Sequence, residues 1–408
     1  MASRRRWMAA VLVAVVAMPA CSGEDAGEQL VPQPADEAPT EPEVALGEVS
    51  TDVRAVPDPL PGAEPGDLVA LAPRNAPDVP AGARGWDLLY RSEGVDGNPV
   101  AVSGVVYAPH GPAPPEGRPV VSWAHGTVGV ADDCAPSRIG VGVPGLERLL
   151  ASGYVVAATD YEGLGAPGVH PYLVGESEGR SVLDAARAAA RIEAAGAGAT
   201  VVAFGHSQGG HAALFAGALA PDYAPDLNLL GVATSAPAAE LSTLLRSAVP
   251  ISPAFGLVAS SIYAYGETYA ELELADVLTP AAIERIEVVD RECLQGVTDA
   301  FIDQRTSAWL VTNPLDVEPW AARVEQNEPG SRKIDAPVLV AQGTTDFVVL
   351  ASSTDTAVDR LCAGGNLVEY REYPGADHGE VLGEAGEGIL DWVDARLAGE
   401  RAVSTCGG

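Results

Sequence analysis

From about Gly66 onward, short apolar runs alternate with segments of helical spacing. The runs expected to form buried strands are 119–126, 154–165, 199–207, 229–237, 336–346 and 366–375. Between some of them, residues 144–153, 180–196 and 209–220 have the apolar spacing and alanine content of crossover helices. Residues 86–109 have the pattern of two antiparallel strands joined by a turn. Together these patterns predict an α/β fold with a mostly parallel central sheet flanked by helices.

One long interval departs from this alternation of strand and helix patterns. Residues 238–330 lie between two predicted strands, and a crossover between parallel strands needs far fewer residues. Within the interval, residues 238–249 and 267–289 have helical periodicity. Thr279 followed by Pro280 resembles the start of a helix. We therefore expect an inserted helical cap over residues 238–330.

The amino-terminal segment has the pattern of an export signal. Residues 1–21 begin with arginines, continue with a short apolar stretch, and end in Cys21 after a small residue. The end resembles a bacterial lipobox, whose cysteine becomes acylated, although two positions depart from the commonest pattern and ordinary secretion stays open. Residues 22–65 are rich in proline and acidic residues, which predicts a flexible tether. This leaves 66–408 as the folded domain.

Charge and cysteine content narrow the functional classes. The formal net charge of −32 argues against a nucleic acid partner, because a phosphate backbone would be repelled. If Cys21 is acylated or removed, four cysteines remain in an exported chain, a number that suits two disulfides. The sequence alone leaves three pairings open. No C-x-x-C spacing points to zinc.

Residues 199–220 place one serine between glycines at a predicted transition from strand to helix. The apolar residues 201–204 supply the strand, and Gly205 and Gly209 flank Ser207 at the offsets of a G-x-S-x-G motif. An alanine-rich helical segment follows directly. This context predicts a nucleophile elbow with Ser207 as the nucleophile.

A serine nucleophile needs a base and an orienting acid. His378 is the only histidine beyond the elbow segment, and it follows a predicted strand, so we expect it to be the base. Asp346 lies at the carboxyl end of a buried strand, the edge where active sites of such sheets lie, and is the expected acid. Asp335 falls at the opposite edge of the same strand. The side chain of Asp377 should point away from that of its neighbour His378.

An oxyanion formed during acyl transfer needs two N–H donors. One is expected from Gln208, directly after the nucleophile. The second is expected from the loop 123–129, where Gly126 allows the backbone to turn toward the serine and the donor would be Thr127 or Val128. His125 precedes the nucleophile in the chain and is expected to shape this turn.

Four stretches together resemble the secretory lipase family of α/β-hydrolases, which includes the fungal lipase A type. These stretches are WAHGTVGVADDCAPS (123–137), GYVVAATDYEGLG (153–165), HPYLVG (170–175) and GHSQGG (205–210). The combination of HGTVG, DCAPS and DYEGLG in this order is more specific than G-x-S-x-G alone. The likeness extends from about residue 80 to the end of the chain.

The resemblance implies an α/β-hydrolase fold and a triad of Ser207, Asp346 and His378. It also implies disulfides that pair Cys134 with Cys293 and Cys362 with Cys406. A helical lid over the substrate pocket is a further implication.

These observations predict a serine carboxylic-ester hydrolase of the lipase or esterase type, secreted or anchored to a membrane through Cys21. Its substrate would be a small-molecule or lipid ester, and its acyl-enzyme chemistry needs no metal or organic cofactor. A serine peptidase or amidase on the same fold stays an alternative, because such a triad serves amides and esters alike. A non-catalytic surface lipoprotein is a second alternative, against which the intact Ser, Asp and His set argues.

Overall fold

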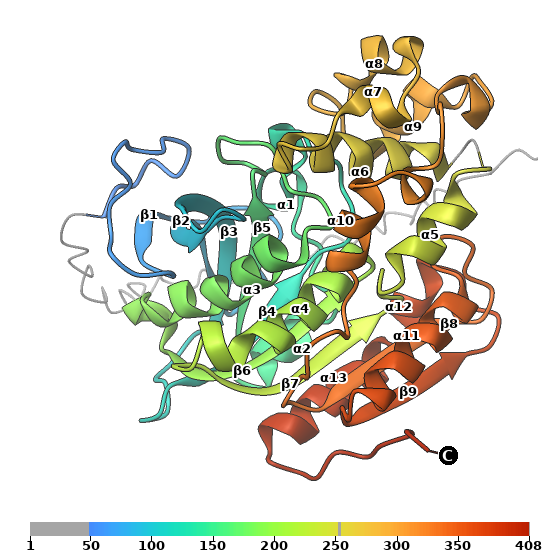
Figure 1. Cartoon of the computed structure of the whole chain (residues 1–408). Helices are drawn as coiled ribbons and strands as arrows, with labels where there is room; N and C mark the ends of the chain where they lie inside the picture. The colour runs from blue at the N-terminus through green and yellow to red at the C-terminus, as the bar shows by residue number, and fades with distance from the viewer. Residues whose placement is uncertain (1–48, 252–253, 408) are drawn as a thin grey trace, which may run out of the picture. The chain divides into compact units, whose positions relative to one another are not determined.

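The computed structural model describes residues 49–251 and 254–407 (Figure 1). The predicted signal peptide, Cys21 and the first part of the predicted tether lie outside the described residues. Within the described part, nine strands form one sheet in the order β1-β2-β3-β5-β4-β6-β7-β8-β9. The strands are β1 Leu68–Pro73, β2 Ala83–Glu93, β3 Pro99–Pro109, β4 Arg118–Ala124, β5 Val155–Glu162, β6 Ala197–His206, β7 Asn228–Ser235, β8 Val338–Gly343 and β9 Val368–Tyr373.

The sheet is mixed, with its parallel part containing the predicted buried runs. Strands β5, β4, β6, β7, β8 and β9 pair in parallel, which confirms the mostly parallel sheet. Strands β2 and β3 form the predicted antiparallel pair over their full lengths. Strand β1 was not predicted as a separate element. It lies at the edge of the sheet and pairs antiparallel with β2, the next strand along the chain.

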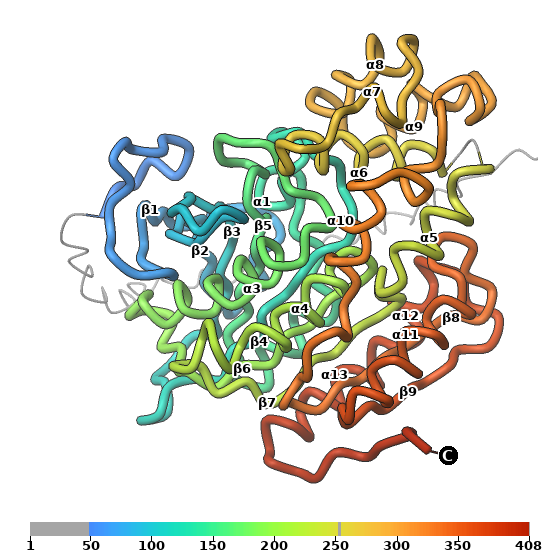
Figure 2. The backbone as a smooth tube through the Cα atoms, viewed as in Figure 1, coloured from blue at the N-terminus to red at the C-terminus, as the bar shows by residue number. Residues whose placement is uncertain are grey.

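Helices cover both faces of the sheet (Figures 1 and 2). The core helices are α1 Pro136–Ile139, α2 Leu146–Ala151, α3 Gly175–Ala190, α4 Gln208–Tyr223, α11 Ala351–Ala363, α12 Glu380–Glu384 and α13 Gly386–Leu397. Successive residues of a strand point to opposite faces. On β6, Ala203 accordingly packs with α3, α4 and α11, whereas Val202 packs with α2, α12 and α13. Both faces are therefore buried, which explains why the central strands are continuous apolar runs.

Part of the predicted tether packs against the domain. Residues 49–65 belong to the described chain, and Ser50 forms a bridge to Ala70 of β1. The apolar side chains of Val53, Val56 and Leu60 lie against a small cluster formed with β1 and β2. The packed chain thus begins before residue 66.

The interval between β7 and β8, residues 238–330, is called the cap below. Its helices are α5 Leu241–Ala248, α6 Phe255–Thr268, α7 Leu274–Val277, α8 Pro280–Ile286, α9 Leu294–Phe301 and α10 Trp320–Gln326. Figure 2 shows the chain leaving the sheet after β7, forming α6 to α9 at the top of the view, and returning to β8. The cap has its own apolar core, in which Phe255, Phe301, Trp309 and Trp320 are buried.

The helical periodicity over 267–289 does not produce one helix. Helix α6 ends at Thr268, and the short α7 and α8 are separated by Leu278 and Thr279. Thr279 is extended because the residue before a proline avoids the helical region. Its side chain accepts a hydrogen bond from the Ala282 N–H at 3.3 Å, so the predicted helix start at this residue is confirmed.

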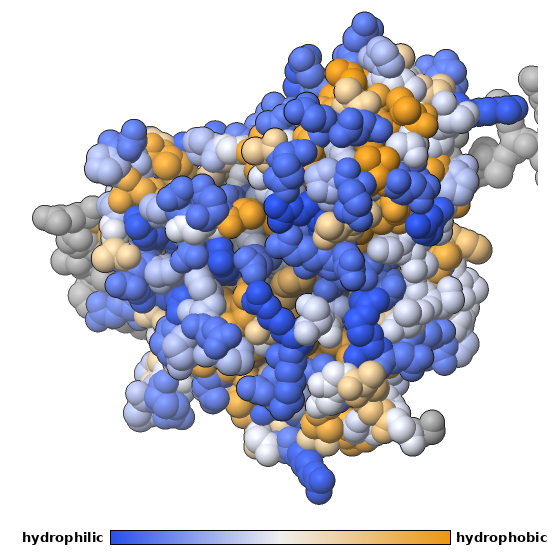
Figure 3. Space-filling view, in the orientation of Figure 1, coloured by the Kyte–Doolittle hydropathy of each residue, from blue (hydrophilic) through white to orange (hydrophobic). Residues whose placement is uncertain are grey.

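The face in Figure 3 is largely hydrophilic, as expected from the strong acidic excess, and hydrophobic residues gather over its upper part, where Figure 1 shows the cap helices. Across residues 49–251 and 254–407, none of the helices combines the length and apolarity needed to cross a membrane.

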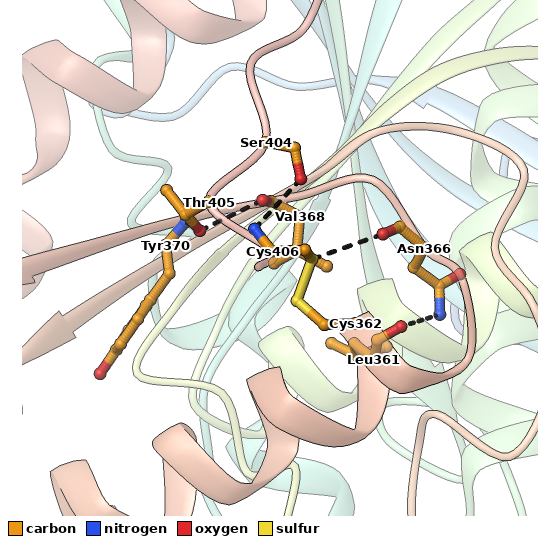
Figure 4. The surroundings of a disulfide bond; sticks show 8 residues. All are labelled: Leu361, Cys362, Asn366, Val368, Tyr370, Ser404, Thr405 and Cys406. Atoms are coloured by element: carbon orange, nitrogen blue, oxygen red, sulfur yellow. Dashed lines mark hydrogen bonds between the residues drawn. A yellow bond between two sulfur atoms is a disulfide. The ribbon is translucent and has the colours of Figure 1, made fainter. Parts of the chain in front are cut away.

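Among the described residues, two disulfides are present, with the pairing that the family resemblance implies. Cys134, after β4, is bonded to Cys293 at the start of α9, so the first disulfide joins the core to the cap. Cys362 on α11 is bonded to Cys406 in the carboxyl-terminal tail (Figure 4). The tail also pairs with β9, since the Thr405 N–H donates to the Val368 carbonyl at 2.8 Å. The second disulfide therefore secures the tail along the edge strand of the sheet.

Removal of the Cys362–Cys406 disulfide is expected to lower the free energy of unfolding by about 2–4 kcal/mol, because the bond restrains the unfolded chain over a separation of 44 residues. The test is chemical denaturation of the double variant Cys362→Ser and Cys406→Ser, with kcat for an ester expected to stay within about twofold. Non-reducing peptide mapping of the unaltered protein is the control. A Cys134 to Cys362 linkage, or an unchanged stability, would contradict the assignment.

Candidate active site

A sharp turn between β6 and α4 carries Ser207. The residue has φ 57° and ψ −118°, outside the regions that side-chain-bearing residues usually adopt. A Cβ at Gly205 would lie 1.9 Å from the Gly209 carbonyl oxygen, and one at Gly209 would lie 1.9 Å from the Ala124 carbonyl oxygen. Glycine is thus required on both sides of the turn. The turn at Ser207 therefore has the tight backbone geometry of the predicted nucleophile elbow.

Three side chains from distant parts of the chain form one hydrogen-bonded line. The Ser207 Oγ lies 3.0 Å from Nε2 of His378, and the His378 Nδ1 lies 2.7 Å from Oδ2 of Asp346. Ser207 follows β6, Asp346 follows β8 and His378 follows β9, so each side chain stands at the carboxyl edge of the sheet. The structure brings all three predicted residues together.

The Asp346 carboxylate is held by donors on both oxygens. Burial opposes its ionisation, but the hydrogen bond and the positive charge of His378 outweigh burial, so the pKa of Asp346 lies below its usual value. Oδ1 also accepts the backbone N–H groups of Val348 and Val349, each at 2.8 Å. Gln342 Nε2 donates to Oδ2 at 3.2 Å. These contacts keep the group ionised and fix its orientation toward His378.

The carboxylates that the sequence analysis set aside lie elsewhere. Asp335 is exposed at the opposite end of β8 and pairs with Lys333. Asp377 is exposed, and its Oδ1 accepts the N–H groups of Gly379 and Glu380 at the start of α12. Neither carboxylate contacts the imidazole of His378 through a hydrogen bond in the described part of the chain.

The histidine within the G-x-S-x-G motif was not predicted to contribute to the site. The ring of His206 lies against that of His378, with 4.8 Å between the ring centroids. Burial, together with the nearby charge of His378, lowers the pKa of His206 to about 4, so its ring is neutral at neutral pH. Its position next to Ser207 in the motif was the available signal.

The predicted oxyanion loop lies beside the elbow. A Cβ at Gly126 would be 3.6 Å from the Ser207 Cβ, so the loop backbone approaches the serine closely. Thr127 Oγ1 is 2.8 Å from the Tyr172 hydroxyl, and the Val128 carbonyl accepts the Leu294 N–H of the cap at 2.9 Å. Gln208 is the first residue of α4, where backbone N–H groups have no partner within the helix.

His125, in the same loop, has the structural position that we expected. Its ring is buried and contacts the ring of Tyr161, with centroids 4.4 Å apart. Its ring nitrogens face the carbonyl oxygens of Gly126 and Asp160.

A cavity of about 480 Å³ opens at Ser207 and His378. Its walls come from the core and from the cap, and the cap contributes mainly apolar side chains of α5 and α6, among them Leu241, Leu245 and Ile262. Within the described ranges, no group of three histidine, cysteine or carboxylate side chains is arranged to hold a metal ion.

A family model described as secretory lipase matches residues 134–405, about two thirds of the chain. The chain belongs to the secretory lipase family. This membership confirms the family resemblance that the sequence motifs indicated. Together with the strand order of the sheet, it confirms the α/β-hydrolase fold. The family supports an ester hydrolase that acts on lipid esters and is exported from the cell.

Several proteins named as lipases are similar to this chain over most of its length. The chain is 26% identical to Lipase 10 of Candida albicans over 383 residues, which cover 84% of this chain and 80% of the relative. It is 27% identical to a Mycobacterium tuberculosis protein named "Probable inactive lipase", covering 79% of this chain and 75% of the relative. The crystal structure of Candida antarctica lipase A in its closed state has the same fold, with a TM-score of 0.74, 20% identity and 84% coverage of each chain.

Proposed function

We propose that this secretory lipase is an active serine hydrolase that cleaves carboxylic esters through an acyl-enzyme on Ser207. The observation that carries the proposal is the line of hydrogen bonds from the Ser207 Oγ to His378 and on to Asp346, at 3.0 and 2.7 Å. A chain that lacked any one of these three groups could not carry out this chemistry.

The hydrogen bonds indicate which nitrogen of His378 carries the hydrogen before the reaction. The His378 Nδ1 faces the carboxylate of Asp346 and therefore carries a hydrogen, which leaves a lone pair on Nε2 toward Ser207. As the Ser207 Oγ attacks the ester carbonyl carbon, its proton passes to Nε2. The negative carboxylate stabilises the imidazolium that forms.

Attack converts the carbonyl oxygen into an oxyanion. We propose that the N–H of Gln208 and the N–H of Thr127 or Val128 donate to it, because the elbow and the Gly126 loop approach each other here. Collapse of the intermediate breaks the bond to the alcohol oxygen, and the imidazolium of His378 protonates that oxygen. Water then attacks the acyl-enzyme, giving its proton to His378, and the carboxylic acid leaves as Ser207 recovers its proton.

The chemistry of the cavity indicates the acyl part of the substrate. Apolar side chains of α5 and α6 line it, so an aliphatic chain would replace water there at a gain of about 0.8 kcal/mol for each buried methylene. We propose that medium or long acyl chains bind between the core and the cap. Acylation of Cys21 would hold the enzyme at a membrane surface, and that residue lies outside the described part of the chain.

The proposed function is tested by measuring kcat/KM for a series of p-nitrophenyl esters from acetate to palmitate, with an aminoacyl anilide alongside. We expect esters of medium or long chains to be preferred and the anilide to be cleaved at least about a thousandfold more slowly. Preference for the anilide would instead identify a peptidase or amidase. No turnover of any substrate by a folded preparation would favour a binding protein.

The role of the cap is tested by the variant Leu245→Trp, which adds volume to a side chain that lines the cavity. We expect the optimum to shift to shorter acyl chains, while kcat/KM for the acetate ester stays within about threefold. The matched control is Leu315→Trp, on a partly buried residue of the cap that does not line the cavity. An unchanged profile in folded Leu245→Trp would mean that the acyl chain does not contact α5.

A further inference from the structure

Behind the nucleophile elbow lies a buried polar cluster that the mechanism above does not use. It consists of Glu178 on α3, Gln208 and His211 on α4, and His170 from the loop before α3, all at most 1% exposed. The Glu178 carboxylate is hydrogen-bonded to both α4 residues of the cluster. Oε1 of Glu178 accepts from Gln208 Nε2 at 2.8 Å, and Oε2 faces the His211 Nδ1 at 2.6 Å.

Hydrogen bonds hold the ring of His211 on both sides. Nδ1 lies 2.6 Å from Oε2 of Glu178, and Nε2 lies 2.8 Å from the backbone carbonyl oxygen of Asn327. The two partners come from α3 and from the residue after α10, so His211 links the core helix α3 to the end of the cap.

His170 completes the constraints on Gln208. The His170 Nδ1 donates to the Glu162 carbonyl oxygen at 2.8 Å, so its Nε2 presents a lone pair to the Gln208 amide nitrogen at 2.8 Å. Burial lowers the pKa of His170 to about 4, which agrees with a neutral ring. Both hydrogens of the Gln208 side-chain amide are thus used, one toward His170 and one toward Glu178, and rotation of the amide would place its oxygen against two acceptors.

Glu178 therefore holds the first turn of α4 at two points. Gln208 and His211 are three residues apart, on one face of the helix, and each binds a different oxygen of the same carboxylate. The backbone N–H of Gln208, the proposed oxyanion donor, belongs to this turn. A displacement of the turn would move the donor relative to Ser207.

The same cluster reaches the end of the cap. Asn327 directly follows α10, and besides accepting from His211 it accepts the Gly175 N–H on its Oδ1 at 2.9 Å. Its Nδ2 donates to the Tyr269 hydroxyl, after α6, at 2.8 Å. The point where the cap returns to the sheet is thus tied to the helix that carries the oxyanion donor.

We propose that the hydrogen-bonded pair of Glu178 and His211 positions the first turn of α4, so that it aligns the Gln208 N–H for the oxyanion and couples this N–H to the return of the cap. Neither side chain touches the reacting atoms, so both act through Gln208 and the first turn of α4. The inference rests on the proposed function, since it assigns a purpose to the same oxyanion site.

The test is the variant Glu178→Gln, which keeps the shape of the side chain but cannot accept on both of its terminal atoms. A misplaced donor weakens binding of the transition state more than binding of the substrate. We expect kcat to fall by about tenfold to a hundredfold, with KM within about twofold. The rate of Ser207 labelling by an alkylphosphonate ester should fall by a similar factor.

The matched control is Asp184→Asn, on the same helix. Asp184 is equally buried and equally bonded, to Ser92, Arg187 and Tyr223, but its network does not include the elbow. We expect this variant to lower the melting temperature while kcat and the labelling rate of the folded enzyme stay within about twofold.

The outcomes separate a positioning role from a structural one. An unchanged kcat in folded Glu178→Gln, a change confined to KM, or an equal loss of kcat in Asp184→Asn would overturn the inference. If Glu178→Gln does not fold, Gln208→Ala decides, because it removes the held side chain and keeps the backbone N–H. A fall in its kcat of about tenfold would support the proposal, and an unchanged kcat would overturn it.

The same labelling experiment keeps the two proposals apart. Failure of the phosphonate to label Ser207 in the unaltered enzyme would defeat the proposed function itself. Normal labelling of the unaltered enzyme, with an equal rate in Glu178→Gln, would defeat only the positioning role.

Discussion

The variant Ser207→Ala is expected to hydrolyse esters with a kcat lower by about three to six orders of magnitude, because it lacks the atom that forms the acyl-enzyme. Its fold should be retained, since the Ser207 Oγ makes its hydrogen bond to His378 in a site that is open to the cavity. Initial rates with a p-nitrophenyl ester measure the loss, and circular dichroism with thermal unfolding checks the fold.

The serine control is Ser353→Ala, which removes a buried hydroxyl on α11 that bonds only to the Leu350 carbonyl in the described structure. This variant should keep its kcat within about twofold. Mass spectrometry after treatment with an alkylphosphonate should find the label on Ser207 and nowhere in Ser207→Ala. A label on another serine, or near-normal turnover by Ser207→Ala, would mean that Ser207 is not the nucleophile.

The second large effect is expected from Asp346→Asn, with kcat lower by about three to four orders of magnitude. The N–H groups of Val348 and Val349 bind Oδ1 of Asp346, and they would hold the oxygen of the new amide at that place. The NH₂ group would then face Nδ1 of His378 and donate to it. The imidazole would be left with its hydrogen on Nε2, where it cannot accept the proton of Ser207.

The matched control is Asp377→Asn, next to the histidine in sequence. Its carboxylate caps the start of α12 and is exposed, so the variant should lose at most about 1 kcal/mol of stability and keep kcat within a few-fold. Measurement of kcat for both variants, with denaturant unfolding alongside, gives the ranking. The reverse ranking would assign the acid to Asp377.

Much of the candidate site could be predicted because its signals are local. The turn at Ser207 demands glycine at positions set by backbone contacts, so the motif is visible in a stretch of a few residues. The parallel sheet could be predicted because strands buried on both faces are continuous apolar runs. His378 was identified because the chain beyond the elbow segment contains no other histidine.

Other features could not be predicted, because they depend on which distant segments meet. Glu178 lies on α3, two residues before the stretch that was predicted as a helix, and nothing in its neighbourhood indicates that His211, from α4, would share its carboxylate. Residues 49–65 have the same kind of sequence as the rest of the predicted tether, and only the structure shows that Val53, Val56 and Leu60 pack against residues of β1 and β2.

The sequence by itself determined the class of fold and predicted the elbow, the proposed triad and the inserted cap, because each depends on backbone sterics, periodicity or chain order. Only the tertiary structure decided that Asp346 points at His378 while Asp377 caps a helix, since two carboxylates near one histidine differ only in where the backbone aims them. It also decided that the return of the cap at Asn327 meets the helix after the nucleophile. Contacts between side chains far apart in sequence arise from packing, and packing has no local signature in the chain.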